Sequence, residues 1–214
     1  MRPSPAELRA LARRDPALGR AMKRVPPFPV FPDAAQRVQR THFHALARAI
    51  VFQQLAGAAA RTIHGRVCAL TPGPHFPKPA EILTLPDECL RGAGLSRNKL
   101  LALRDLAGKI ESGELDLIRI ARRTDERIVE ELVQVRGIGE WSAQMFLIFR
   151  LGRLDVMPVT DLGVREGARR LDNLKERPTP KELLARSEAW RPLRSVASWV
   201  LWRLTEEKTR ATAK

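Results

Sequence analysis

The sequence predicts an all-α protein, and three observations support that fold class. Apolar residues recur at spacings of three and four along most of the chain, which is the period of an amphipathic helix. No segment shows the sustained alternation of apolar and polar residues that indicates a strand. Hydrophobic residues make up 44% of the 214 residues, enough to bury the core of one domain or of two small lobes.

The N-terminal part predicts a helix, a connector and a second helix. The first 20 residues are rich in alanine, leucine and arginine and predict a helix. Residues 25–33 contain four prolines, which restrict their own backbone and that of the preceding residues, so this segment should be extended. Thr41 is the expected N-cap of the next helix, which should end near Gln53 and Gln54. Its apolar face carries Phe43, Leu46, Ala47, Ile50 and Val51.

Further helices should follow to the end of the chain. A helix through Ile63, Val67 and Leu70 should stop at the proline-containing segment 71–79. The last helix should start near Pro192, because proline suits a first helical turn. A polar tail from Glu206 should be frayed. The intervening helices are predicted by apolar stripes at Leu100, Leu103, Leu106 and Ile110, at Ile128, Leu132 and Val135, at Trp141, Met145, Ile148 and Phe149, and at Leu162, Ala168 and Leu171.

The net charge of +14 points to a polyanionic partner, most often a nucleic acid. The alternative is an arginine-rich surface that has no specific partner. Two cysteines, Cys68 and Cys89, are too few for an iron–sulfur cluster or an all-cysteine zinc site. No apolar run approaches the roughly 20 residues of a membrane span, and the N-terminus lacks the apolar core of a signal peptide. We therefore expect a cytoplasmic protein, nucleoid-associated if the chain is bacterial.

The most informative stretch runs from Leu132 to Gly167. Near its start, VRGIGEW places Gly137 and Gly139 between two apolar helical segments. Glycine permits a tight hairpin and a close approach of the backbone, and the next helix would direct exposed N–H groups toward an anion. This pattern predicts a tight hairpin between two helices, at about residues 128–150, with an anion site suited to a phosphate. A plain connection between two helices is the alternative.

Four motifs in order give the chain a family resemblance. They are IVFQQLAGAAARTI (residues 50–63), GLSRNKLLALRDLA (94–107), the hairpin followed by Asp161, and WRPLRSVASWVLWR (190–203). Between about residues 40 and 204 the chain resembles the helix-hairpin-helix (HhH-GPD) DNA glycosylases. It is most similar to their 3-methyladenine DNA glycosylase II (AlkA-like) branch, in a compact form without the N-terminal β-rich domain.

The resemblance implies a monofunctional enzyme of base excision repair. Members that also cut the DNA backbone carry a lysine where this chain has Trp141, and tryptophan cannot form a Schiff base. The implied reaction is hydrolysis of the N-glycosidic bond of alkylated bases, such as 3-methyladenine and 7-methylguanine, by a monomer acting on double-stranded DNA. Two alternatives stay open: a glycosylase for uracil, mismatched thymine or an oxidised base, or a non-enzymatic helix-hairpin-helix module that only binds DNA.

The resemblance also assigns roles to individual residues. Asp161 would stabilise the cationic sugar, although aspartate in that place is otherwise an ordinary helix cap. The base pocket would contain Trp141, Trp202, Met145 and Leu162, whereas Trp199 would pack in the core. The residues that fill the hole left by the flipped base would be Gln53, Gln54 or Leu55. Phosphate contacts would come from Gly137, Gly139, Arg136, Arg194 and Ser195. The carbonyls of Val133, Val135 and Ile138 would hold a structural Na⁺ or K⁺.

These roles imply two lobes with the active site in a cleft between them. A central lobe, residues 41–157, would carry the hairpin. The N-terminal segment, residues 1–40, and residues 158–205 would form the second lobe with Asp161. Residues 206–214 would be a polar tail.

Overall fold

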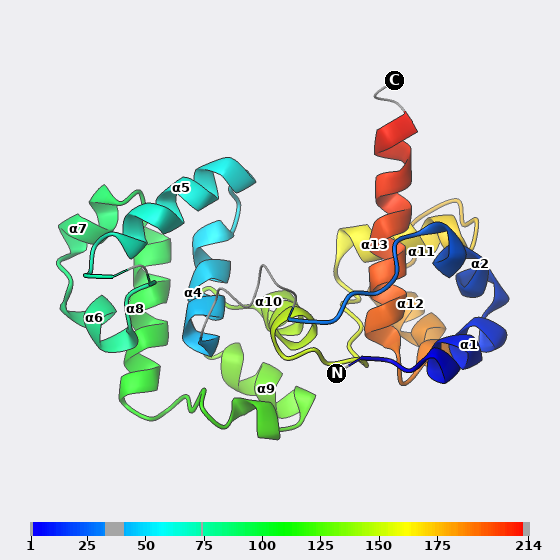
Figure 1. Ribbon diagram of the computed structural model, residues 1–214, viewed down its shortest axis with the longest axis horizontal. Coiled ribbons are helices and arrows are strands. Elements are labelled where there is room, and N and C mark those ends of the chain that lie inside the picture. Colours follow the sequence, from blue (N-terminus) through cyan, green and yellow to red (C-terminus); the bar gives the residue numbers. More distant parts are fainter. Residues whose placement is uncertain (1, 33–40, 74, 212–214) are drawn as a thin grey trace. The chain divides into compact units, whose positions relative to one another are not determined.

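The computed structural model describes residues 2–32, 41–73 and 75–211, and these residues form helices, turns and loops without a strand (Figure 1). The predicted all-α fold class is therefore confirmed. None of the helices in this part of the chain is long and apolar enough to cross a membrane. Residue contacts divide the chain into a terminal unit, Met1–Asp33 with Leu147–Lys214, and a central unit, Ala34–Phe146. The sequence analysis put these boundaries at 40/41, which lies outside the described residues, and at 157/158.

The terminal unit begins with two helices rather than the single one expected. Helix α1 (Pro5–Arg14) ends at Asp15, and α2 (Pro16–Arg24) starts immediately after it. Asp15 has an extended backbone because it precedes a proline, which disfavours the helical conformation. The Asp15 carboxylate caps α2 by accepting a hydrogen bond from the Leu18 amide (2.9 Å) and also accepts one from the indole of Trp190 (2.7 Å).

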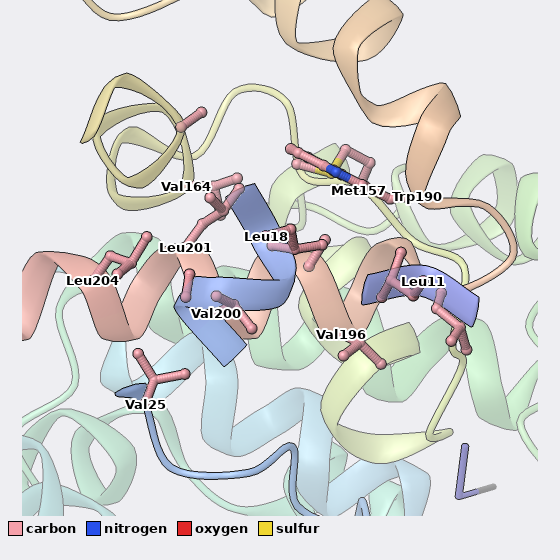
Figure 2. Close-up of a cluster of buried hydrophobic side chains, with 14 of the residues drawn as sticks. Leu11, Leu18, Val25, Met157, Val164, Trp190, Val196, Val200, Leu201 and Leu204 are labelled. Carbon is pink, nitrogen blue, oxygen red and sulfur yellow. The ribbon is translucent and has the colours of Figure 1, made fainter. Parts of the chain in front are cut away.

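The remaining helices of the terminal unit surround α13 (Arg194–Ala211). A π-helical turn (Phe146–Arg150) leads into a loop, followed by α11 (Leu162–Leu171), α12 (Pro180–Ser187) and a 3-10 turn (Glu188–Trp190). Figure 2 shows the core, in which side chains from α1, α2 and α11 converge on α13. Its largest members are Leu11, Leu18, Met157, Leu183, Trp190, Leu193, Leu201 and Leu204.

Helix α13 differs from its prediction at both ends. It starts at Arg194 rather than at Pro192, because Leu193 donates to the Trp190 carbonyl (2.8 Å) and closes a turn first. It continues to Ala211, beyond the start of the expected polar tail at Glu206, and the fraying of that tail stays a prediction. The end of the predicted tail, residues 212–214, lies outside the described residues.

In the central unit three helices pack against α8 (Arg97–Glu111). Helix α4 (His42–Phe52) is capped as predicted, since the Thr41 hydroxyl accepts a hydrogen bond from the His44 amide (3.1 Å). The contacts of α8 are with α4, α6 and α7 (Figure 1). The other elements of the central unit are α5 (Gly57–Cys68), α6 (Pro79–Thr84), α7 (Asp87–Gly92), a 3-10 turn (Ile120–Arg122), α9 (Asp125–Leu132) and α10 (Glu140–Met145).

Three helices, α6, α7 and α12, have no counterpart in the sequence analysis. Helices α6 and α7 contain six residues each and α12 contains eight, so none repeats its apolar positions often enough to produce a clear stripe. The end of α6 is held by Arg104, whose guanidinium donates to the carbonyls of Ile82 and Leu85 and to the Asp87 carboxylate. The Arg104 side chain of α8 therefore stabilises α6, a helix that the local sequence does not predict.

Candidate active site

Asp161 lies at the N-cap of α11, where one of its carboxylate oxygens accepts two hydrogen bonds. The Val164 amide donates to Asp161 Oδ1 (2.8 Å), which is the capping contact that the sequence left open as an alternative. The Trp202 indole N–H donates to the same oxygen (2.9 Å). A simple cap needs only the first contact. The second one orients the carboxylate from α13, 41 positions along the chain.

Trp202 therefore contacts the candidate catalytic carboxylate directly. Its ring also stacks on Phe149, with centroids 5.7 Å apart and planes 27° apart. Sequence reasoning placed Trp202 in the base pocket and did not single out Phe149, which was one member of an apolar stripe. No local signal distinguishes Phe149 from the other members, because only the path of α13 brings Trp202 to it.

Glycine is needed at two positions where α11 approaches α13. A Cβ on Gly163 would lie 3.0 Å from Trp202 Cδ1 and 3.1 Å from Asp161 Oδ1, so any side chain there would disturb the indole–carboxylate contact. A Cβ on Gly167, one turn later, would lie 2.2 Å from the carbonyl oxygen of Leu201. Both glycines permit the close helix contact that brings Trp202 to Asp161.

The other predicted pocket residues are divided between the units. Leu162, which follows Asp161, is 60% exposed on the first turn of α11 in the terminal unit. Trp141, at 46% exposed, and the partly buried Met145 lie one turn apart on α10 in the central unit. An exposed indole is available to stack on a base. The shared pocket stays a prediction.

Two of the residues predicted to contact phosphate make contacts inside the terminal unit. The Ser195 side chain is 0% exposed, and its hydroxyl accepts a hydrogen bond from the Val156 amide (3.0 Å). Arg194 is 12% exposed at its side chain, and its Nε and Nη2 donate to both carboxylate oxygens of Asp155 (2.8 and 3.1 Å). Ser195 is therefore buried and Arg194 forms an ion pair that anchors the start of α13, and the assignment of both residues to phosphate stays a prediction.

The predicted hairpin is present in the central unit, between α9 and α10. Gly137 adopts a φ of +78°, which side chains rarely tolerate. Its carbonyl accepts a hydrogen bond from Gln53 Nε2 (2.8 Å), and the amide of Arg136 donates to Asp105 (2.7 Å). The hairpin is thus tied to the end of α4 and to α8. A Cβ on Gly139 would meet nothing within 4 Å, so the chain itself does not require glycine there.

The residues predicted to replace the flipped base form the turn after α4. Gln53 is engaged with the hairpin carbonyl, whereas Gln54 and Leu55 are exposed. Gln54 has a positive φ of 54°, a conformation typical of a tight turn. The assignment of one of the three as the wedge stays a prediction, and the engagement of Gln53 favours its two neighbours.

The carbonyls predicted to hold a cation surround the same hairpin. Val133 caps the end of α9, where helical carbonyls lack intrahelical partners. The Val135 carbonyl accepts a hydrogen bond from the Ile138 amide (3.0 Å). A group of backbone oxygens at a helix end is chemistry suited to Na⁺ or K⁺, so this site also stays a prediction.

Comparison with known proteins identifies the family to which this chain belongs. The family model described as "HhH-GPD superfamily base excision DNA repair protein" matches residues 47–192, more than half of the chain. The chain belongs to the HhH-GPD superfamily. Among curated HhH-GPD relatives, DNA-3-methyladenine glycosylase 1 of Schizosaccharomyces pombe is 38% identical over 165 residues, which cover 77% of this chain and 72% of that protein.

Two solved HhH-GPD structures resemble the whole chain closely. One is the DNA-3-methyladenine glycosidase of Bacillus halodurans, with a TM-score of 0.82 and 33% identity over 98% of this chain and 95% of the other. The other is the S. pombe 3-methyladenine DNA glycosylase in complex with abasic DNA, with a TM-score of 0.77 and 33% identity over 92% and 95% of the two chains. The described residues of this HhH-GPD chain contain helices and no strand, in agreement with the compact form that its motifs resemble.

Proposed function

We propose that this protein is a monofunctional DNA glycosylase that hydrolyses the N-glycosidic bond of alkylated bases such as 3-methyladenine and 7-methylguanine. Its HhH-GPD relatives at 33–38% identity carry the name DNA-3-methyladenine glycosylase or glycosidase. One observation carries the assignment to chemistry rather than to DNA binding alone. The carboxylate of Asp161 is held by a second donor, Trp202, that helix capping does not require.

The reaction follows from what a fixed carboxylate does near a sugar. Departure of the base leaves oxocarbenium character on the deoxyribose, and an oriented carboxylate stabilises that charge and positions water. An alkylated purine that is already cationic leaves readily and needs little help from a general acid. Its electron-poor ring also suits an exposed indole such as Trp141.

The partner we propose is double-stranded DNA with a damaged base. The net charge of +14 provides a sequence-independent attraction to phosphate. The hairpin and the turn at Gln54 and Leu55 would grip and bend the duplex while the base rotates out of the stack. The active site would lie in a cleft between two lobes, as in the family that the motifs resemble, and the enzyme would act as a monomer.

The decisive experiment is Asp161→Asn. Asparagine can still accept the hydrogen bonds of Val164 and Trp202, so the fold should survive, but the negative charge is lost. We expect the single-turnover release of 3-methyladenine to fall by at least about 10²–10³. Binding to damaged DNA should persist or improve, because a charge that repels phosphate is removed.

Asp116→Asn is a matched control. Asp116 also accepts backbone hydrogen bonds, from Ile118 and Arg119, but it lies in a turn of the central unit. It should keep the wild-type rate. Near-normal excision by a folded Asp161→Asn protein would show that Asp161 is only a helix cap.

A further inference from the structure

We propose that a pocket in the terminal unit, formed by α2, the C-terminal end of α11 and α13, binds a phosphate group. The pocket has a volume of about 590 Å³. It is separate from the Asp161–Trp202 contact, which involves the first residue before α11. Its lining consists of four arginines, one asparagine and small or aliphatic side chains: Ala17, Arg20, Ala21, Arg24, Arg169, Arg170, Leu171, Asn173, Leu174 and Leu204.

The charge of this pocket has one sign. Its lining includes four arginines and no acidic residue. Arg20 and Arg24 are exposed and lie four positions apart on α2, where side chains share a face. Like charges at this spacing destabilise an isolated helix.

The other two arginines are held in place by one carboxylate. Glu166 accepts from Arg169 Nη2 (2.8 Å) and from Arg170 Nε (3.0 Å), and also from Arg177 Nε (3.2 Å). These hydrogen bonds, that of Arg169 first, lower the pKa of Glu166 to about 2, so the carboxylate stays charged. One negative charge thus positions three positive ones, and a net positive charge remains.

Arg170 is further fixed by the backbone of α13. Its Nη1 donates to the carbonyls of Leu204 (2.7 Å) and Thr205 (3.1 Å). Ordering an arginine side chain on binding loses rotamer entropy. Arg170 is already ordered in the free protein, so this loss does not weaken ligand binding.

The positive charge of the four guanidinium groups favours an anion such as phosphate as the ligand, although Arg169 Nε, Nη1 and Nη2 already donate to Glu166 and Leu174. Guanidinium presents a planar fork of N–H donors that matches phosphate oxygens in a bidentate fashion. Helix α11 connects this pocket to the candidate catalytic residue, since Asp161 caps one end and Arg169 and Arg170 lie near the other. At 1.5 Å per residue, ten residues separate the two ends by roughly 15 Å.

We assign the phosphate to the DNA backbone, and this part of the inference rests on the proposed function. One strand of duplex DNA advances about 3.4 Å per nucleotide, so a distance of roughly 15 Å corresponds to four or five nucleotides. A strand whose damaged nucleotide lies at Asp161 would reach the pocket within that distance. The pocket would then hold a phosphate that flanks the lesion.

The test compares two double variants with the same change in net charge. Arg20→Gln/Arg24→Gln alters the pocket, and Arg13→Gln/Arg14→Gln removes two exposed arginines of α1 that do not line it. Affinity for an undamaged duplex is measured as a function of salt concentration. Each phosphate contact contributes about 0.9 to the slope of log affinity against log salt. We expect the pocket variant to lower the slope by about 1–2 and the control variant to leave it nearly unchanged.

Inorganic pyrophosphate serves as the probe that distinguishes a small phosphorylated molecule from DNA as the ligand of the pocket. If the pocket serves a small phosphorylated molecule, pyrophosphate will raise the Tm of the wild type and of the control but not of the pocket variant, and the two variants will have equal DNA slopes. That result keeps the phosphate site and replaces DNA as its ligand. If both variants behave alike in both assays, the proposal is wrong. Neither assay measures base release, so the site and the proposed reaction can fail independently.

Discussion

At the scale of single residues, one oxygen atom connects structure and proposed chemistry. Asp161 Oδ1 accepts a hydrogen bond from the Val164 amide, which caps α11, and a second one from the Trp202 indole of α13. The stacking of Trp202 on Phe149 limits rotation of the indole, and the absent side chain of Gly163 leaves room for its N–H. A residue that acts on the sugar must hold its geometry closely, and this set of contacts provides that restraint.

The role of the indole N–H predicts a defect in Trp202→Phe. Phenylalanine keeps an aromatic ring beside Phe149 but cannot donate to Asp161. A hydrogen bond to a charged group contributes about 1.5–3 kcal/mol. We therefore expect the single-turnover rate to fall by about 10- to 100-fold, with little change in DNA affinity.

Trp199→Phe is the control for this prediction. Trp199 lies on the same helix and also donates its indole N–H, to the Pro26 carbonyl (3.0 Å), but it does not bond to Asp161. This variant should stay within about twofold of the wild-type rate, because it leaves the stabilising carboxylate unchanged. A wild-type rate for Trp202→Phe would mean that the carboxylate holds its position without the indole.

At the scale of elements, the contact between α11 and α13 positions the candidate site. The two helices approach so closely that the backbone of Leu201 occupies the space of a Gly167 side chain. Helix surfaces usually keep their axes 8–10 Å apart through their side chains, and glycine is the residue that allows a closer approach. The same contact supports Arg170 of the phosphate pocket against α13.

The closeness of this contact predicts that Gly167→Ala is destabilising. The new methyl group would overlap the Leu201 carbonyl, and overpacking of this kind costs about 1–3 kcal/mol or more. For a protein of this size that corresponds to a Tm lower by roughly 2–12 °C. Thermal unfolding followed by circular dichroism measures the shift.

Gly108→Ala provides the opposite expectation. Gly108 lies inside α8, and a Cβ there would meet nothing within 4 Å. Alanine should stabilise that helix by about 0.5–1 kcal/mol, because it restricts the unfolded chain. If Gly167→Ala melted at or above the temperature of Gly108→Ala, the close contact of α11 with α13 would be refuted.

At the scale of the whole molecule, the charge and the two units serve one proposed reaction. The net charge of +14 attracts DNA without regard to sequence. The candidate catalytic Asp161 lies in the terminal unit, whereas the hairpin and the exposed Trp141 lie in the central unit. Only the resemblance to the superfamily indicates that the two units would act on the same DNA duplex.

The reaction should produce an abasic site and leave the DNA strand intact. The motif resemblance implies that Trp141 stands where lyase-type relatives carry a lysine. The partly buried Lys99 donates to the Val51 carbonyl (2.7 Å). A Schiff base requires an amine at the sugar. Borohydride added during turnover of duplex DNA with 7-methylguanine should trap no covalent adduct, whereas a lyase-type glycosylase in the same assay should. A trapped adduct would identify another lysine as nucleophile.

Local sequence was sufficient for much of this protein. The helical period determined the all-α class, Thr41 and Asp161 marked the starts of α4 and α11, and the two glycines marked the hairpin. Each of these features depends on residues fewer than about eight positions apart. Within that range, hydrogen-bonding capacity and backbone freedom decide the outcome, and both can be read from residue types.

Only the tertiary structure decided which residues meet. Trp202 reaches Asp161 across 41 positions, and Gln53 reaches the hairpin across 84. The structure also buried Ser195 and paired Arg194 with Asp155, two residues that the motif had assigned to phosphate. The physical reason is that such contacts depend on how helices cross, which follows from packing of the whole core rather than from any one segment.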